Sequence, residues 1–288
     1  MSKVSIVLPT YNGAKFLRGA IGSCLAQTHR DLELILVDDC STDATPDILR
    51  SYTDARVRVL RNKVNQRLPR SLNIGFKAAT GDYLTWTSDA NEYAPDAIEK
   101  MLQRLKDSQA DLVYADYWAL DEVTGKKEQV RLPDQLSPSR KNEVGGCFLY
   151  TRRVYEEIGE YNPFLEMVED YDYWIRIWKR FKTAHCAEPL YLYRFHAQSL
   201  TTTRAYAQDL FDVILKFRNG FLPLSKLGWS GAYYFQNVER SDKSPAEKRK
   251  IVSHTWKMVW GISPGFYILF LVVVFLYSFR IKKVVSSQ

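Results

Sequence analysis

Short apolar runs alternate with amphipathic stretches through the first part of the chain. Residues 4–8 form a β-branched apolar run that ends at Pro9, and residues 32–37 form a second run of the same kind. Between the two, apolar side chains recur at helical spacing over residues 14–27, as expected for one buried face of a helix. A strand, a helix and a strand of these lengths predict a β-α-β unit of a parallel sheet.

The same alternation continues as far as residue 117. Further helices are expected at residues 45–51, 68–79 and 95–108, and further strands at residues 57–60, 83–87 and 111–117. Pro95 stands at the start of the last of these helices, where its missing N–H group removes no helical hydrogen bond. This order of elements predicts an α/β fold.

The pattern becomes less regular after residue 117. Residues 126–142 are polar and typical of a loop. A second, smaller sub-domain is predicted from a strand at residues 144–149, helices at residues 152–158 and 170–180, and a returning strand at residues 191–195. We therefore expect the main domain to occupy residues 1–205, with a division near residue 118.

From residue 206 onward the chain is rich in aromatic and basic side chains. Residues 206–257 are expected to form an amphipathic connector. Residues 258–279 contain 22 residues without a formal charge, close to the roughly 20 apolar residues that span a bilayer core. A membrane-inserted or re-entrant helix is thus predicted at residues 258–280, followed by a basic tail at residues 281–288. A helix buried against the domain or against a partner is the alternative.

Charge and cysteine content narrow the function classes. The net charge is +7, but the residues from Val238 onward hold nine Lys and Arg against three Asp and Glu, which leaves only about +1 for the first 237 residues. A main domain of this charge is not expected to bind nucleic acid. The four cysteines are scattered, which argues against a zinc site and favours a reduced domain facing the cytosol. The first residues read as a strand rather than as a signal peptide.

Polar clusters follow three of the predicted strands. They are Thr10-Tyr11-Asn12, Asp38-Asp39 and Ser88-Asp89. In an open parallel sheet, ligands bind beyond the carboxyl ends of the strands. The sequence therefore predicts that these clusters line one crevice.

Four segments of the sequence stand out as motifs: VSIVLPTYNG at 4–13, LILVDDCSTD at 34–43, TGDYLTWTSDAN at 80–91 and VEDYDYWIRI at 168–177. In this order, they resemble the motifs of glycosyltransferase family 2. The resemblance covers about residues 2–203. It implies the GT-A fold, a Rossmann-like mixed sheet flanked by helices, with a donor half at residues 1–118 and an acceptor half at residues 119–205.

The resemblance also implies an activity and a location. The chain is expected to be an inverting glycosyltransferase that uses a UDP-, GDP- or dTDP-linked sugar and a glycan or lipid-linked acceptor. The QxxRW-type motif of processive synthases is not found in the sequence, so one sugar per acceptor is expected. The C-terminal segment would place the enzyme at the cell membrane, with its catalytic domain in the cytoplasm.

Donor-binding roles follow from the matched motifs. Asp39 resembles the family's base- or ribose-binding aspartate, and Thr10 and Tyr11 would hold the base. Arg194 and His196 match a segment whose basic side chains approach the diphosphate or a metal ion. They lie two residues apart, so on a strand they share a face. The alternative for the residues around Asp39 is a turn that caps the next helix.

The metal motif departs from the family pattern. Relatives place a metal-binding carboxylate where this chain has Ala90, and alanine cannot bind a cation. Mg²⁺ or Mn²⁺ would then depend on Asp89, Asn91 and His196. Three explanations stay open: a substitution that disables the enzyme, metal binding by the remaining residues, or loss of catalysis with donor binding kept.

The pair Glu169-Asp170 resembles the family's ED motif, which implies that the catalytic base lies here. Asp170 would remove the proton of the acceptor hydroxyl, whereas a helix cap is the bland alternative for an aspartate at a helix start. The acceptor is expected to contact Glu169, Trp174 and the loop residues Gly146 and Cys147. Two other functions compete with the leading one: a polyprenyl-phosphate sugar synthase, and a catalytically silent scaffold that binds a sugar nucleotide.

Overall fold

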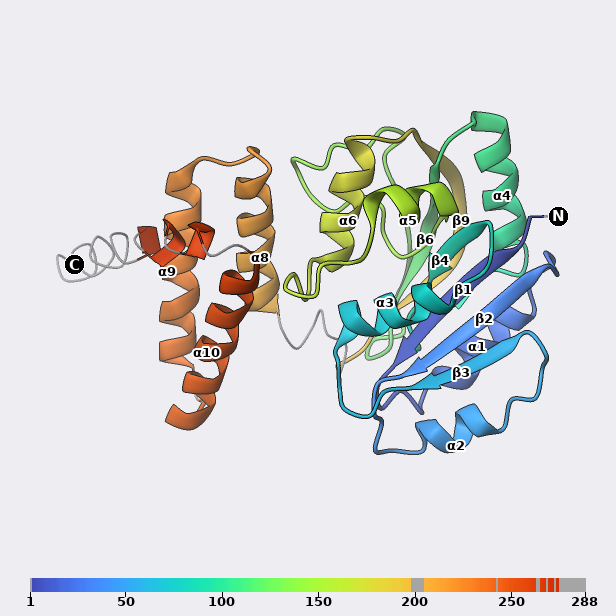
Figure 1. Cartoon of the computed structure of the whole chain (residues 1–288), viewed down its shortest axis with the longest axis horizontal. Helices are drawn as coiled ribbons and strands as arrows, with labels where there is room; N and C mark the ends of the chain where they lie inside the picture. Colours follow the sequence, from blue (N-terminus) through green and yellow to red (C-terminus); the bar gives the residue numbers. More distant parts are fainter. Residues whose placement is uncertain are drawn as a thin grey trace. The chain divides into compact units, whose positions relative to one another are not determined.

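The computed structural model describes residues 2–197, 205–241, 243–262, 265–267, 269–271 and 273–274. The chain divides into two compact units (Figure 1). The first, here called the sheet unit, comprises Met1–Tyr161 and Tyr173–Ala197. The second, here called the helical unit, comprises Asn162–Asp172 and Gln198–Gln288. The predicted basic tail at residues 281–288 lies outside the described residues, as do residues 275–280 of the predicted membrane segment.

One mixed sheet forms the centre of the sheet unit. Its strands are β1 (Val4–Thr10), β2 (Leu32–Asp38), β3 (Val57–Arg61), β4 (Tyr83–Trp86), β5 (Glu92–Tyr93), β6 (Leu112–Asp121), β7 (Lys127–Val130), β8 (Phe148–Thr151) and β9 (Thr183–Phe195). The strand order is β3-β2-β1-β4-β8-β6-β9-β5, with β7 paired to β6. Strands β1 to β4 are parallel, whereas β8 runs antiparallel to both β4 and β6. The predicted α/β fold and its opening β-α-β unit are confirmed.

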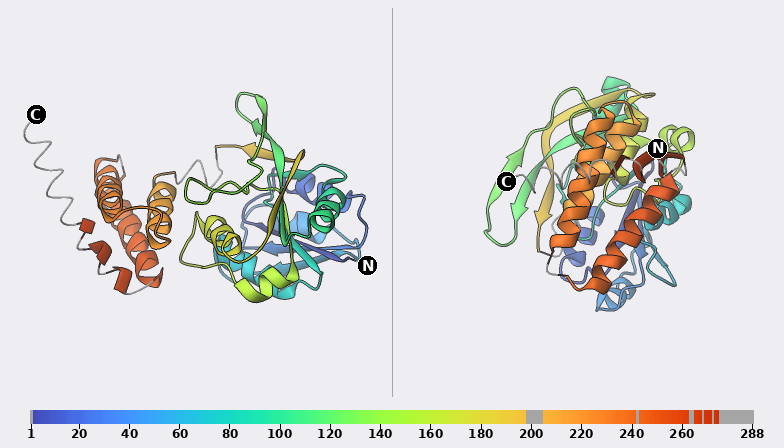
Figure 2. Two further views of the ribbon diagram at one scale, coloured as in Figure 1. Left: turned by 90° about the horizontal axis from the view of Figure 1, so that it is seen from above. Right: turned by 90° about the vertical axis from the view of Figure 1, so that its left-hand side faces the viewer.

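Helices cover both faces of this sheet (Figures 1 and 2). They are α1 (Leu17–Leu25), α2 (Thr45–Arg50), α3 (Leu68–Ala78), α4 (Ala97–Ser108), α5 (Arg152–Ile158) and α6 (Glu169–Trp178). Ile6 of β1 packs in a core with α1 and α4, and its neighbour Val7 packs in a second core with α3, α5 and α6. The alternation of side chains along a buried strand explains this division.

The sheet differs from the sequence prediction in several details. Strand β5 was not predicted, β9 begins at Thr183 and not at residue 191, and β8 and β9 join the main sheet instead of a second sub-domain. Pro9 lies within β1 instead of ending it. Strand β4 pairs with β1 only as far as Val7, so the N–H group that Pro9 lacks is not needed for that ladder. Strand β7 lies in the segment predicted to be a loop, and its side chains are mostly exposed. A strand without a buried face gives no apolar alternation in the sequence.

The helical unit contains three long helices that lie side by side (Figures 1 and 2). They are α8 (Ala205–Arg218), α9 (Leu224–Arg240) and α10 (Pro245–Ile262). Gly231 of α9 allows a close approach, because a Cβ atom there would lie 2.4 Å from Val274 and 3.2 Å from Phe270. Trp256 of α10 stacks on Phe235 with ring centroids 5.0 Å apart.

The predicted membrane segment is thus partly described. Its first residues, from Met258, complete α10, and Phe270, Val273 and Val274 are buried within the helical unit. Insertion of this segment into a membrane stays a prediction. Within the described parts, none of the helices combines the length and the apolar character needed to cross a bilayer.

Candidate active site

The ends of β1, β2 and β4 lie at one edge of the sheet. The Thr10 hydroxyl donates a hydrogen bond of 2.6 Å to Asp89 Oδ2, and the Asp39 amide donates one of 2.9 Å to the Thr10 carbonyl. Parallel pairing of the three strands places their carboxyl ends together. The structure therefore brings Thr10, Asp39 and Asp89 into one cluster, as the sequence predicted.

Gly13 makes this cluster possible. A Cβ atom on Gly13 would lie 2.0 Å from Asp89 Oδ2 and 2.5 Å from Thr10 Oγ1. The loop after β1 thus wraps closely around the Asp89 carboxyl group, and burial raises the pKa of that group. The Thr10 hydrogen bond and the charge of His196 act in the opposite direction and favour the ionised form. The sequence argument assigned Gly13 no role of its own.

Asp39 organises the loop that leads into α3. Its Oδ1 atom accepts hydrogen bonds from Asn62 Nδ2 at 2.8 Å and from the Gln66 amide at 2.7 Å, and its Oδ2 atom accepts one from the Arg67 amide at 2.8 Å. Arg67 precedes α3 with a positive φ of 69°. Such a backbone conformation persists only where neighbouring groups hold it. Asp39 therefore stabilises the start of α3. The alternative predicted from the sequence was a cap on the helix that directly follows β2.

Asn12 joins the loops after β1 and β2, a role that the sequence argument missed. Its side-chain oxygen accepts hydrogen bonds from the amides of Thr42 at 2.8 Å and Asp43 at 3.3 Å, and its own amide donates to Ser41 Oγ at 2.9 Å. Asn12 has a φ of 54°, which asparagine tolerates better than most residues. The adjacent Tyr11 remains 50% exposed, so its ring offers a surface on which a base can stack.

Arg194 and His196 lie at the end of β9 and share a side, as predicted. The Phe16 ring centroid lies 5.6 Å from the Arg194 guanidinium and 5.3 Å from the His196 ring. Arg194 also donates to Glu122 at 2.6 Å and to Glu92 at 2.5 Å. Its charge is therefore offset locally by two carboxylates, and a contact with a diphosphate stays a prediction. His196 is the basic group whose charge acts on Asp89.

The residues predicted to bind a metal ion fit one only in part. Asp89 and His196 interact, but the Asn91 side-chain oxygen accepts a hydrogen bond of 2.9 Å from the Arg194 amide. Ala90 is buried, with 6% of its surface exposed. Among the described residues, no group of three His, Cys, Asp or Glu side chains is arranged to hold a metal ion.

Three residues predicted to contact an acceptor lie in or against the core of the sheet unit. Cys147 is fully buried, with its thiol 3.8 Å from the sulfur of Met101. The Trp174 ring packs edge-on against Phe148 at 4.5 Å and is 2% exposed. A Cβ atom on Gly146 would lie 3.0 Å from the Tyr191 ring. The structure thus gives the side chains of Cys147 and Trp174 packing positions, not positions on an acceptor-binding surface.

Glu169 and Asp170 begin α6 and belong to the helical unit. Burial, followed by the nearby charges of Asp170 and Glu166, raises the pKa of Glu169 to about 8. The Glu169 Oε2 atom has no hydrogen-bond partner within the described residues. Asp170 is half-buried in the first helical turn, where the helix dipole favours a negative charge. Burial and the neighbouring carboxylates therefore favour the protonated form of Glu169, and Asp170 lies directly beside it in the first turn of α6.

Known proteins resemble this chain in sequence and in structure. Residues 5–159 match the family Glycosyl transferase family 2. An uncharacterised glycosyltransferase of Rickettsia felis is 33% identical over 68% of this chain and 34% of its own length, and one of Rickettsia typhi is 32% identical over 76% and 71%. This chain thus spans only about a third of the first relative. A putative teichuronic acid biosynthesis glycosyltransferase of Bacillus subtilis is 27% identical over 70% of this chain and 82% of its own length.

Solved structures show the same fold at low sequence identity. TarS of S. aureus, residues 1–349 in complex with UDP, has a TM-score of 0.64 at 13% identity and covers 96% of this chain and 89% of its own. The same protein in complex with UDP-GlcNAc has a TM-score of 0.62 at 14% identity, over 91% and 73%. A mannosyltransferase of Pyrobaculum calidifontis in complex with GDP-Man and Mn²⁺ has a TM-score of 0.58 at 14% identity, over 94% and 86%.

Proposed function

We propose a reaction for this chain, which belongs to Glycosyl transferase family 2 and is a glycosyltransferase. It transfers one sugar, with inversion, from a nucleotide-diphosphate sugar to a glycan or lipid-linked acceptor. The observation that carries the proposal is the cluster of Thr10, Asp39 and Asp89 at the carboxyl edge of β1, β2 and β4. Ligands of open α/β sheets bind at this edge.

A UDP-, GDP- or dTDP-linked sugar is the donor in this proposal. Structures of similar fold hold UDP, UDP-GlcNAc and GDP-Man, which supports the donor class. In this chain the exposed ring of Tyr11 suits stacking on the base. Asp39 is buried beside it and can accept a further hydrogen bond from the base or the ribose.

Asp170 acts as the base in the proposed reaction. It removes the proton of the acceptor hydroxyl while the hydroxyl oxygen attacks the anomeric carbon from the side opposite the diphosphate. The bond between the anomeric carbon and the phosphate oxygen breaks, and the nucleoside diphosphate leaves with the bonding electrons. The position of Asp170 supports this assignment, because its side chain is only half-buried at the start of α6 and a base has to reach the acceptor hydroxyl.

Mg²⁺ or Mn²⁺ is the proposed cofactor. Asp89 and His196 would hold the cation together with oxygens of the diphosphate, and its positive charge would stabilise the leaving nucleoside diphosphate. Ala90 leaves this set one carboxylate short of the family pattern, which favours weakened metal binding. The same alanine supports a second candidate function, a chain that binds sugar nucleotides and has lost transfer.

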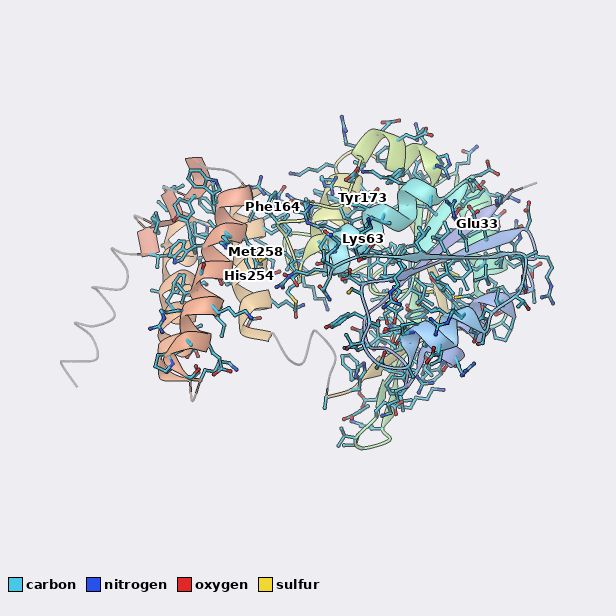
Figure 3. All side chains as sticks on the ribbon, turned by 60° about the horizontal axis from the view of Figure 1, so that its bottom comes forward. Glu33, Lys63, Phe164, Tyr173, His254 and Met258 are labelled. Atoms are coloured by element: carbon cyan, nitrogen blue, oxygen red, sulfur yellow. The ribbon has the colours of Figure 1, made fainter. Side chains whose placement is uncertain are left out.

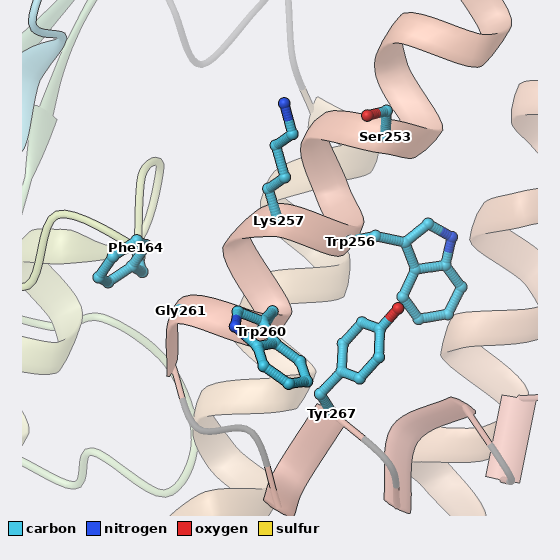
Figure 4. A pocket seen from close by; sticks show the side chains of 7 residues that line it. All are labelled: Phe164, Ser253, Trp256, Lys257, Trp260, Gly261 and Tyr267. Carbon is cyan, nitrogen blue, oxygen red and sulfur yellow. The ribbon is translucent and has the colours of Figure 1, made fainter.

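An aromatic pocket in the helical unit supports a lipid-linked acceptor at the membrane. The pocket measures about 810 Å³, and its wall includes Phe164, Trp256, Lys257, Trp260 and Tyr267 (Figure 4). Aromatic rings with an exposed lysine are typical of surfaces that meet lipid head groups. We propose that the enzyme works at the cytoplasmic face of the cell membrane, with this pocket next to the lipid.

A donor panel tests the proposed function. Calorimetry with UDP-, GDP- and dTDP-linked sugars, with Mg²⁺ or Mn²⁺ present, is expected to give a dissociation constant between about 1 μM and 1 mM for one nucleotide class. Hydrolysis or transfer of the same sugar is then measured by release of the nucleoside diphosphate. Absence of binding for every sugar nucleotide and every nucleoside diphosphate would contradict the proposal.

Gly13→Ala is expected to weaken donor binding about tenfold or more, equivalent to about 1.4 kcal/mol. The added methyl group would collide with Asp89 Oδ2, so the carboxyl group must leave its place. Gly22→Ala is the matched control, since a Cβ atom at Gly22 meets nothing within 4 Å among the described residues. Calorimetry measures the donor affinity, and thermal unfolding shows that both variants fold. Equal donor affinity in the two variants would count against Asp89 as a donor-site residue.

A further inference from the structure

The segment that carries Asp170 is held by the helical unit. This segment, Asn162–Asp172, is here called the acidic segment, and it groups with the C-terminal helices and not with the sheet. One of its residues, Met167, has a positive φ of 82°. A non-glycine residue keeps such a conformation only where the surrounding structure over-determines it. The contacts made by the C-terminal helices therefore bear on the shape of the acidic segment.

The first contact joins Phe164 to Gly261 of α10 (Figure 4). A Cβ atom on Gly261 would lie 2.1 Å from Cδ1, 2.3 Å from Cε1 and 2.5 Å from Cγ of the Phe164 ring. The ring thus occupies the space of the missing side chain and lies against the helix backbone. No residue other than glycine fits at position 261 unless Phe164 moves.

The second contact is a hydrogen bond between the side chains of Glu166 and His254 of α10. The two side chains approach to 3.2 Å between Oε2 and Nε2, and Glu166 is 5% exposed. Figure 3 labels His254 and Phe164. His254 precedes Gly261 by seven residues, which is two helical turns, so both contacts arise from one face of α10.

A third contact comes from α8. The ammonium group of Lys216 lies 5.9 Å from the centre of the Tyr171 ring and pairs with Asp212 at 2.8 Å. Tyr171 follows Asp170 directly and is buried. The acidic segment is therefore fixed at its beginning, middle and end by side chains of the helical unit.

We propose that α10 positions the catalytic base, and that His254 and Gly261 are positioning residues for sugar transfer. This inference rests on the proposed function, in which Asp170 takes the acceptor proton. Neither residue needs to touch a substrate for this role. Asp170 follows Phe164 and Glu166 by only a few residues, so a movement of either side chain is transmitted to Asp170 through the backbone. A displacement of about 1 Å at a reacting group lowers rates about a hundredfold. The helical unit thus contributes to chemistry as well as to any acceptor binding.

The test uses the full chain with Gly261→Ala and His254→Leu. Each variant is expected to lower kcat for transfer at least about tenfold, while the donor KM and the calorimetric affinity for the nucleoside diphosphate stay within about twofold of the unchanged chain. Gly22→Ala, a helical glycine with open space, is the control and should leave all three values unchanged. Thermal unfolding is recorded for each protein.

Two further variants separate positioning from general damage to the fold. His254→Lys supplies an N–H donor for Glu166 and should recover most of the kcat lost in His254→Leu. In a Phe164→Ala background, Gly261→Ala should cause little additional loss, because the two residues act through one contact. Additive losses, or no recovery with lysine, would overturn the proposal.

The outcomes distinguish this inference from the proposed function. If the unchanged chain binds no sugar nucleotide, the proposed function fails and the inference fails with it. If the unchanged chain binds and transfers, and Gly261→Ala and His254→Leu transfer at the same rate, only the positioning role fails. A fall in kcat with unchanged donor affinity supports both.

Discussion

Asp170→Asn is expected to lower the rate of sugar transfer by about a hundredfold or more while the affinity for the donor changes little. General base catalysis contributes about 10²–10⁴ to enzymatic rates, and an asparagine of nearly the same shape cannot accept the hydroxyl proton. Donor affinity should persist because Thr10, Asp39 and Asp89 belong to the sheet unit. Single-turnover transfer at saturating donor, with calorimetry of the nucleoside diphosphate, measures both quantities.

Asp172→Asn is the matched control for this variant. It removes an acid from the same first turn of α6 and should leave the transfer rate within about threefold, because in the proposed reaction Asp172 does not take the acceptor proton. An equal loss in both variants would assign the effect to the helix and not to the base. A transfer rate insensitive to Asp170→Asn would favour the polyprenyl-phosphate sugar synthase, because a phosphate acceptor needs no deprotonation by the enzyme.

Asp170→Asn is also expected to change how the free energy of unfolding depends on pH. Glu169 has a pKa raised from 4.5 to about 8, so the native chain holds a proton that the unfolded chain releases between these values. The free energy of unfolding therefore falls as pH rises through this window. Asp170→Asn removes one cause of the shift and should make this fall shallower. Urea denaturation at several pH values between about 5 and 8 measures the slope.

Ala90→Asp is expected to raise metal-stimulated turnover about tenfold or more. The new carboxylate would lie beside Asp89 and supply the ligand oxygen that the family pattern has at this position. Ala90 is buried, so an unpaired carboxylate there destabilises the chain unless a cation offsets its charge. The variant should therefore unfold at a lower temperature than the unchanged chain without metal, and Mn²⁺ should raise that temperature by several degrees.

Ala90→Asn is the control for the metal prediction, because it adds a side chain of similar size without the charge. It should show neither the turnover gain nor the large response to Mn²⁺. If Ala90→Asp binds the sugar nucleotide and Mn²⁺ but still transfers nothing, the silent scaffold becomes the better description of this chain. If Mn²⁺ changes neither turnover nor unfolding, the cation site has been placed wrongly.

Local sequence patterns predicted the sheet and the meeting of its polar strand ends. The β-branched runs around Ile6 and Ile35 each form buried strands, because burial on both faces requires continuous apolar residues. Parallel pairing then fixes where Thr10 and Asp89 lie. Their hydrogen bond follows from topology that the alternation of strands and helices already contains.

Partners that come from distant parts of the chain could not be predicted in this way. Arg194 pairs with Glu92 and Glu122, which lie 102 and 72 residues away in the sequence, and no local pattern connects them. Cys147 was predicted to contact the acceptor, yet its thiol is buried. The grouping of Asp170 with the C-terminal helices depends on contacts such as that of Phe164 with Gly261, to which sequence spacing gives no clue.

The hydrogen bonds of Asp39 give any variant at this position two effects. Its carboxylate already holds the amides of Gln66 and Arg67 before a nucleotide arrives. Without that anchor, the turn into α3 gains conformational freedom, and an incoming nucleotide has to restrict it again upon binding. Under the proposed function, weaker affinity in such a variant would combine a lost contact with an added entropic penalty, because Asp39 also keeps the turn into α3 ordered.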